Sequence, residues 1–164
     1  YITRMGLIVG GAEAIDQGKQ AWLNDAAWQG LRKYVEDSFV VQDWFELFVA
    51  QNLVLDGLLF PLIYGMYEHH MSEKVGTGVS LMVRFQNDWY AETVKFVDAQ
   101  IKTAAAESPE NAELLKDWIN QYADSAANAL LPLAQLALGD AGAQAVADGR
   151  AQLNARVQKL GVAV

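Results

Sequence analysis

The sequence predicts an all-α protein in which at least four long helices form a bundle. Only 3 of the 164 residues are proline, no stretch alternates apolar and polar residues as a half-exposed strand does, and residues 38–71 form one long apolar run. A helix that is apolar on nearly every side must be buried among several neighbours. Polar residues interrupt the run more often than a membrane-spanning helix tolerates, at Asp43, Glu46, Gln51, Asn52 and Asp56. We therefore interpret it as the central helix of a soluble helical body.

Two weaker helices precede the apolar run. Residues 1–24 form the first, and its glycines, Gly6, Gly10 and Gly11, either permit close approach of another helix or mark a bend. Asn24 or Asp25 is expected to cap a short second helix that ends near residue 36.

The apolar helix is expected to begin at Ser38, which is a good N-cap residue. Pro61 should kink it, because proline lacks the backbone donor and its ring clashes with the preceding turn. Residues 72–78 are polar and contain two glycines, so they form the clearest break in the chain.

Three more helices follow the break, and the first of them covers residues 79–107. Ser108 is expected to cap the next helix, with Pro109 at its first position, where a missing N–H does no harm. That helix runs to residue 138 with a bend at Pro132. Gly139 then ends it, and Asp140 caps a last helix over residues 141–160.

The composition limits the possible functions. Lysine and arginine number 12 against 20 aspartates and glutamates, and the resulting net charge of −8 argues against binding to nucleic acids or anionic membranes. The absence of cysteine excludes a disulfide framework, a thiolate nucleophile and a cysteine-ligated metal. No signal peptide is recognisable, so we expect a cytoplasmic protein. The length suits a single helical domain over residues 1–164, and a first residue other than methionine indicates a piece of a longer polypeptide.

The histidines do not follow the pattern of a metal site in a helical bundle. Such a site uses carboxylates and a Glu-x-x-His pair whose members lie one turn apart. The chain has two histidines, His69 and His70, and neither follows an acidic residue by three positions. Neighbouring side chains point about 100° apart on a helix, so Glu68, His69 and His70 cannot converge on one ion. We favour a structural role for both histidines at a helix C-terminus, with a metal role as the alternative.

The helix over residues 79–107 has one apolar and one charged face. Glu92 lies on the apolar face, so its carboxylate should be buried in a hydrogen bond or ion pair, or else bind a metal. The apolar face comprises Met82, Phe85, Trp89, Glu92 and Phe96, and the charged face comprises Arg84, Asp88, Lys95, Asp98 and Lys102. The comparable inward face of the long apolar helix comprises Trp44, Phe48, Gln51, Leu55, Leu59 and Leu62.

Two adjoining segments resemble a known family. Residues 27–35 (AWQGLRKYV) and 36–64 (EDSFVVQDWFELFVAQNLVLDGLLFPLIY) are similar to the β chain of the bacterial multicomponent diiron monooxygenase hydroxylases, and within that family most of all to the phenol hydroxylases. The resemblance is specific over about residues 27–107. It implies a ferritin-like bundle of long helices that lacks the diiron site, and it implies that this chain is the C-terminal part of such a subunit.

The resemblance also implies which ligand positions have been lost. In the iron-bearing α chain of the family, one helix provides a glutamate, and a later helix provides a glutamate and a histidine. Residues 86–92 (QNDWYAE) resemble the later motif, so Trp89 stands at the glutamate position and Glu92 at the histidine position. Leu55 stands at or near the position of the earlier glutamate. The resemblance therefore implies no catalytic, cofactor-binding or metal-binding residue on this chain.

A structural subunit is the role that the resemblance implies. Hydroxylases of this family are (αβγ)2 assemblies, in which β chains brace the iron-bearing α chains and help to join the two halves. The whole system is an NADH-dependent monooxygenase that converts phenol to catechol with O2. It uses a diiron centre in the α chain, a reductase with FAD and an iron–sulfur cluster, and a coupling protein. The residues that we expect to form contacts or core are Trp44, Phe45, Phe48, Trp89 and Tyr90.

Three alternatives remain open from the sequence. The chain can belong instead to a related toluene, alkene or methane monooxygenase. It can be a ferritin-like oxidase whose metal site uses Asp43, Glu46, Glu92 and either His69 or His70. It can also be a helical adaptor unrelated to oxygenases, although so hydrophobic a chain argues against a solitary protein.

Overall fold

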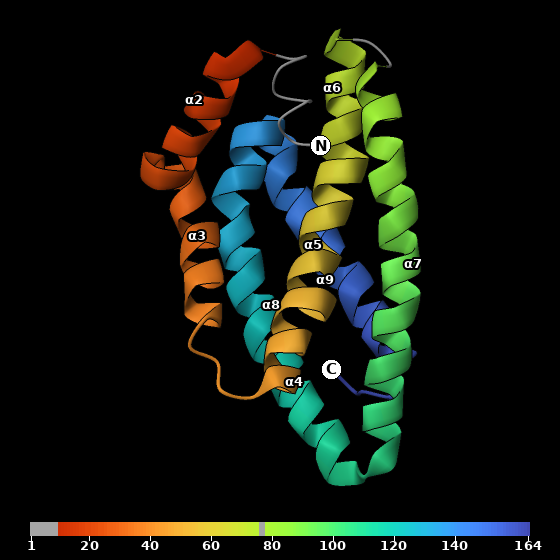
Figure 1. The fold of residues 1–164 in the computed structure, drawn as a ribbon. Helices are drawn as coiled ribbons and strands as arrows, with labels where there is room; N and C mark the ends of the chain where they lie inside the picture. Colours follow the sequence, from red (N-terminus) through yellow and green to blue (C-terminus); the bar gives the residue numbers. More distant parts are fainter. Residues whose placement is uncertain (1–9, 76–77) are drawn as a thin grey trace.

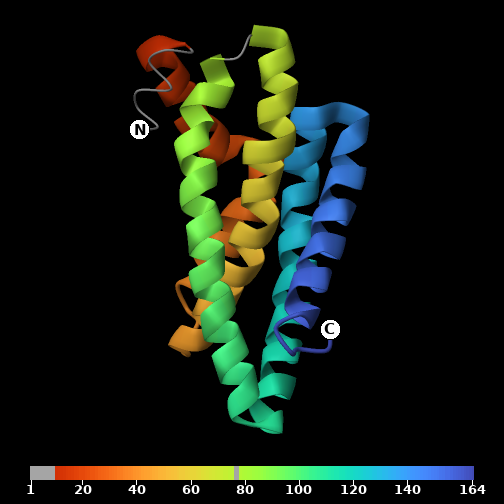
Figure 2. The same ribbon diagram turned by 90° about the vertical axis from the view of Figure 1, so that its right-hand side faces the viewer.

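A short helix, α2, Gly11–Asn24, begins the part of the chain that the computed structural model describes, which comprises residues 10–75 and 78–164. The long helices lie side by side in an elongated bundle (Figure 1, Figure 2). No β-strand occurs in the described residues, and the all-α prediction is confirmed. The other elements are, in chain order, α3 Ala26–Ser38, α4 Trp44–Phe48, η1 Val49–Leu55, α5 Asp56–Pro61, η2 Leu62–Tyr67, α6 Glu68–Val75, α7 Gly78–Glu107, α8 Pro109–Leu138, η3 Gly139–Ala141 and α9 Gly142–Gln158.

The first two helices meet at Asp25. Its carboxylate accepts a hydrogen bond of 2.9 Å from the backbone N–H of Ala27 and caps α3, as predicted. Gly11 has a φ of +69°, in the left-handed region that glycine adopts without strain. The sequence predicts that Gly10 and Gly11 lie inside a helix over residues 1–24. In the structure they mark the start of α2 instead. Residues 1–9, which include Gly6, lie outside the described residues.

The long apolar helix begins after Asp43 and not at Ser38. Asp43 Oδ1 accepts hydrogen bonds from the backbone N–H groups of Phe45 (2.7 Å) and Glu46 (3.3 Å). Ser38 instead ends α3, where its Oγ donates to the carbonyl oxygen of Val35 at 2.6 Å. The predicted cap at Ser38 is wrong because a non-helical connection separates the two helices, and the aspartate at its end caps a helix as well as serine does.

One helical rod runs through residues 44–75, from orange to yellow in Figure 1, and contains two π-helical segments. The first, η1, precedes α5, and the second, η2, directly follows Pro61. The rod does not end at Pro61 but changes there from α-helical to π-helical geometry. Because a π turn accommodates one residue more than an α turn, each π segment rotates the side chains beyond it relative to a regular helix.

The rod and α7 form a long helical hairpin. α6 extends to Val75, so the break predicted for residues 72–78 begins too early, and residues 76–77 lie outside the described residues. Near the end of α6 and the start of α7, Ser72 Oγ and Ser80 Oγ lie 2.8 Å apart, and both hydroxyls donate to the Glu68 carboxylate. This carboxylate therefore joins α6 to α7 through two short side chains.

The predicted ends of α8 are confirmed, but the predicted cap of α9 at Asp140 is wrong. Ser108 Oγ accepts a hydrogen bond of 3.1 Å from the backbone N–H of Asn111 and caps α8. Gly139, with a φ of +60°, ends α8, which continues through Pro132. Asp140 does not cap α9, because the chain forms the 3₁₀ turn η3 and then enters α9 without a side-chain cap.

The core lies among α3, the rod, α7, α8 and α9. The elements contribute Leu31 from α3, Leu53 from η1, Ile101 from α7, Ile119 from α8 and Val157 from α9, and each of these side chains is buried. Each fully buried aliphatic side chain contributes about 1.5–3 kcal/mol relative to an exposed one. The C-terminal half of α7 thus takes part in the core.

Two glycines bring neighbouring helices into contact with the backbone of α8. A Cβ on Gly30 of α3 would lie 3.1 Å from the Cα and O atoms of Ala129. A Cβ on Gly142 of α9 would lie 2.5 Å from the carbonyl C and O atoms of Ala134. Glycine therefore permits both close approaches, because any larger residue requires the backbones to separate.

The rod is long and apolar enough to cross a membrane by length and composition alone, over Trp44–Glu73, and it is the one such helix in the described residues. The core helix of a soluble protein meets the same criteria. In this fold, 39% of the most apolar window of the rod is buried inside the bundle.

Candidate functional site

The positions at which the resemblance places metal ligands carry no set of donor atoms. Leu55 is buried in the core, and Trp89 packs edge-on against Phe60 with ring centroids 6.2 Å apart. Glu92 is exposed and binds Lys95 Nζ at 2.6 Å, so the prediction of a buried carboxylate here is wrong. Leucine and tryptophan offer no oxygen or ligating nitrogen to iron, and these residues do not fit a diiron centre. The absence of metal-binding residues from the whole chain stays a prediction.

The predicted apolar face of α7 points away from the bundle. Phe85, Trp89 and Phe96 are 69%, 51% and 60% exposed. The opposite side of the helix enters the core with Val97 and Ile101. The prediction that the aromatic residues point inward is therefore wrong for this chain, although they do share one face of the helix.

A polar cluster lies between the rod, α7 and α9. Arg156 Nε of α9 donates to Asp98 Oδ1 of α7 at 2.7 Å, and 17% and 28% of the two side chains are exposed. Asn52 Nδ2 donates a long hydrogen bond of 3.5 Å to Asp56 Oδ2. The charge of Arg156 also attracts the carboxylate of Asp56 and favours the ionised form of Tyr90. We call Asn52, Asp56, Tyr90, Asp98 and Arg156 the central polar cluster.

Burial dominates the electrostatics of this cluster. It raises the pKa of Asp56 from 3.8 to about 6, against the lowering effects of the Asn52 hydrogen bond and the Arg156 charge. Burial likewise raises the pKa of Tyr90, although Arg156 lowers it. Tyr90 is therefore a neutral phenol at pH 7, and Asp56 carries a charge that folding has made less favourable. The arrangement cross-links three helices and contains no nucleophile beside a base.

Replacing Asp56 by asparagine is expected to change how stability depends on pH. Because folding raises the pKa of Asp56, this group stabilises the fold most below about pH 4, and the contribution is lost as pH rises through about 6. Relative to Asp56→Asn, the wild-type free energy of unfolding should fall by about 2 kcal/mol between pH 4 and pH 7. Urea titrations of both proteins across this range measure the difference. A difference that stays constant with pH would contradict the raised pKa.

Two tyrosines hold the start of the rod, α4 and η1, against α3 and α8. Tyr34 OH of α3 donates to the carbonyl oxygen of Ala50 at 2.8 Å, and Tyr122 OH of α8 donates to Glu46 Oε1 at 2.7 Å. Burial, reinforced by neighbouring ionisable groups, raises the pKa of Tyr34, while burial and Glu46 raise that of Tyr122 to about 12. Both phenols are therefore protonated at neutral pH and act as hydrogen-bond donors to the start of the rod.

The residues of the alternative oxidase site do not converge. Asp43 caps the rod, and Glu46 accepts the hydrogen bond from a tyrosine of α8. His69 Nε2 lies 3.5 Å from Glu73 Oε1 on the surface, and His70 lines an apolar pocket elsewhere. In residues 10–75 and 78–164, no three histidine, aspartate or glutamate side chains gather closely enough to hold a metal ion.

The exposed side of α7 carries aromatic side chains and meets the aromatic residues at the start of the rod through Phe96. We call Leu81, Phe85, Trp89 and Phe96 the α7 face; each is more than half exposed. Phe96 packs edge-on against Phe48 (ring centroids 6.3 Å apart), and Phe48 stacks on Phe45 (5.6 Å), which touches Trp44 (5.2 Å). Of the five residues predicted to form contacts or core, Trp44 and Trp89 are exposed and Phe45, Phe48 and Tyr90 are half-buried. The Met82 side chain lies outside the described part of the chain.

Sequence reasoning did not find the ion pair at the centre of the polar cluster. The sequence pattern places Asp98 on the charged face of α7, and its partner Arg156 lies 58 residues further along the chain. No local spacing connects two residues that far apart. The one available signal was Asp56, an acidic residue in the most apolar stretch of the chain, next to Leu55.

Comparison with known proteins gives consistent matches. Residues 1–108 match the Methane/Phenol/Alkene Hydroxylase family. The chain is 47% identical over 164 residues to phenol 2-monooxygenase, oxygenase component DmpL, from Pseudomonas sp. strain CF600, covering 99% of this chain and 49% of that protein. It is 29% identical over 118 residues to the beta subunit of the hydroxylase component of the toluene-4-monooxygenase system from Ectopseudomonas mendocina, covering 70% of this chain and 36% of that protein.

The fold matches a solved structure as well. The chain superimposes on a chain of xenon-pressurised phenol hydroxylase from Pseudomonas sp. OX1 with a TM-score of 0.90 and 38% identity. The match covers 98% of this chain and 49% of that one. The chain thus spans about half the length of the phenol 2-monooxygenase oxygenase components and of the solved chain that it matches.

Proposed function

The chain belongs to the Methane/Phenol/Alkene Hydroxylase family, and from this membership we propose that it is a structural, non-catalytic part of a multicomponent monooxygenase hydroxylase. It forms one helical domain of a β subunit and occupies the C-terminal part of that subunit. The complex converts phenol to catechol with O2 and electrons from NADH. The similarity to phenol 2-monooxygenase oxygenase components supports the choice of phenol as substrate.

The observation that carries this proposal is that the side of α7 expected to face inward is exposed, while its opposite side packs in the core. Where the resemblance places ligands, Leu55 and Trp89 offer no donor, and the side of α7 that would face a metal carries exposed aromatic residues. An aromatic surface of this kind costs solubility in an isolated chain and is typical of a permanent protein interface. We propose that the α7 face packs on the helices of an iron-bearing α subunit, and that this contact braces both.

The proposed partners follow from the family. The α subunit carries the diiron centre, γ subunits and a second β chain complete an (αβγ)2 assembly, and no cofactor binds to this chain. A reductase with FAD and an iron–sulfur cluster and a small coupling protein act on the assembled hydroxylase. The similarity to subunits of multicomponent hydroxylases supports assembly with other chains.

A charge placed on the α7 face is expected to prevent assembly. Phe85→Asp and Phe96→Asp each put a second carboxylate on the face that already holds Glu92, whose charge Lys95 pairs, so the new charge would be buried in the interface without a partner. In the full-length polypeptide co-expressed with the other hydroxylase subunits, each change should reduce co-purification of the α subunit at least tenfold. Because both residues are exposed in this chain, the melting temperature of the separately purified full-length polypeptide should change by less than about 2 °C. A larger fall would show that the rest of the subunit, and not the α subunit, covers this face.

The matched control is Ala91→Asp, which places the same charge at an exposed position of α7 outside the α7 face. Co-purification should be close to that of the wild type. Equal losses in all three variants would contradict docking through the α7 face. Iron analysis of the separated subunits tests the other half of the proposal: iron retained by this polypeptide alone would contradict a non-catalytic role.

A further inference from the structure

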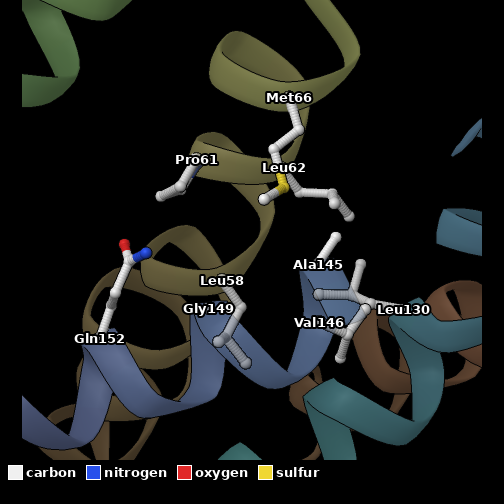
Figure 3. A pocket seen from close by; sticks show the side chains of 9 residues that line it. All are labelled: Leu58, Pro61, Leu62, Met66, Leu130, Ala145, Val146, Gly149 and Gln152. Atoms are coloured by element: carbon white, nitrogen blue, oxygen red, sulfur yellow. The ribbon is translucent and has the colours of Figure 1, made fainter. Parts of the chain in front are cut away.

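A small cavity between the rod, α8 and α9 is used by neither the central polar cluster nor the α7 face. It has a volume of about 130 Å³ and is partly open to solvent, because Met66 and Gln152 in its lining are exposed. It lies beside Pro61, at the point where α5 gives way to η2 (Figure 3). Leu58 and Leu62 of the rod, Leu130 of α8 and Val146 of α9 form its walls. Its existence does not depend on the proposed function.

The cavity exists because α9 presents two small residues to the rod. Ala145 and Gly149 lie one helical turn apart and both line the hollow. A Cβ on Gly149 would meet Leu58 Cδ2 at 3.6 Å, which is an ordinary van der Waals contact. The space is therefore not required for close backbone approach, in contrast to Gly142, and a methyl group would fit into it.

The chemistry of the lining selects an apolar guest. A water molecule needs two to four polar partners to be held in a cavity, and Gln152 is the only polar side chain in the lining. An enclosed apolar cavity of about 150 Å³ stays dry and binds benzene or xenon, and the closed end of this hollow, between Leu58, Leu62 and Leu130, has the same apolar lining. From this match in size and polarity, we propose that the cavity binds one monocyclic aromatic molecule.

The two adaptable side chains of the lining set how such a molecule lies. Met66 bends over the hollow, and Figure 3 shows its sulfur close to Leu62, so the thioether contacts the edge or face of a bound ring. Gln152 stands at the opposite edge below Pro61. Its amide makes no hydrogen bond with the described residues and is free to bind a hydroxyl substituent, so a phenol binds more tightly than benzene.

The experiment measures benzene and phenol binding to the full-length polypeptide or the purified complex by thermal shift. A ligand that binds the folded state raises the melting temperature as its concentration rises. Gly149→Ala fills part of the cavity and favours the helix, so it folds, and it should weaken benzene binding at least tenfold. The matched control is Gly18→Ala in α2, where a Cβ meets no atom within 4 Å, and it should bind benzene as the wild type does.

Gln152→Leu separates the polar from the apolar contribution. It should leave benzene binding intact and reduce the preference for phenol about fivefold, which is the effect of one lost hydrogen bond. A xenon-pressurised crystal of the complex gives a direct reading, with a xenon peak expected among Leu58, Met66 and Val146. Equal benzene shifts in Gly149→Ala and Gly18→Ala, or xenon peaks elsewhere with none here, would overturn the proposal. Neither result would bear on assembly with the α subunit.

Discussion

Replacing Arg156 by methionine is expected to lower the free energy of unfolding by about 3 kcal/mol. Methionine keeps much of the apolar stem of the side chain but removes the guanidinium from Asp98, which it contacts at 2.7 Å, and from Asp56. Two partly buried carboxylates then lose their compensating charge. Truncating one partner of a well-buried ion pair costs about 3–5 kcal/mol, and the 17% and 28% exposure of this pair places the effect at the lower end. Urea unfolding of the full-length polypeptide at pH 7 measures it.

The loss should shrink as the pH is lowered, because protonation of Asp56 removes one of the two uncompensated charges. The matched control is Arg150→Met, on the same helix. Arg150 Nη2 binds Asp124 at 2.9 Å, but the Asp124 side chain is 75% exposed. Each arginine also has one buried guanidinium nitrogen without a hydrogen bond in the described residues, so the difference between the two lies in the exposure of the carboxylate partner. This change should cost less than about 1 kcal/mol. If the two arginine variants were equally unstable, the central polar cluster would have no special role.

Replacing Gly142 by alanine is expected to destabilise the fold by about 3 kcal/mol, although alanine is normally the better helix residue. The new Cβ would lie 2.5 Å from the backbone carbonyl of Ala134 and 2.6 Å from the backbone N of Gln135. Backbone atoms cannot rotate away as a side chain does, so α9 must move off α8 and open the packing around Ala145. Thermal denaturation of the full-length polypeptide provides the measurement.

Gly149→Ala serves as the control for the same substitution on the same helix. Its Cβ meets only the end of the Leu58 side chain, at 3.6 Å, so the gain in helix propensity should raise stability by up to about 1 kcal/mol. The two alanine variants should therefore shift the melting temperature in opposite directions. A Gly142→Ala protein as stable as the wild type would show that α9 can separate from α8 at little cost.

Helix ends were the part of the fold that the sequence predicted best. Asp25, the Ser108 cap with Pro109, and Gly139 act locally, because each side chain or φ angle satisfies backbone groups within four residues. Ser38 and Asp140 are also residue types that cap helices well, but the predictions that they cap the rod and α9 are wrong. Their local preference says nothing about the non-helical connection before the rod or the 3₁₀ turn before α9.

The inward faces were harder to predict, for two physical reasons. The π segments η1 and η2 break the 3.6-residue period, so the stripe predicted on the rod combines buried Leu55 and Leu62 with Trp44, which is 75% exposed. On α7, hydrophobicity marks any surface that avoids water, whether it faces the core or another chain. The prediction that Phe85 and Phe96 share one face of α7 is therefore correct, and the prediction that this face points inward is wrong.

The guanidinium of Arg156 gives this bundle a cation that is part of the polypeptide. It joins α9 to α7 through Asp98 and acts on Asp56 of the rod, as a bound metal ion would join carboxylates from separate helices. Such a cross-link exists from the moment the chain is synthesised, does not compete for scarce iron, and is untouched by chelators or by a change of oxidation state. Under the proposed function, this chain can therefore fold first and present a finished surface to a subunit that still awaits its metal.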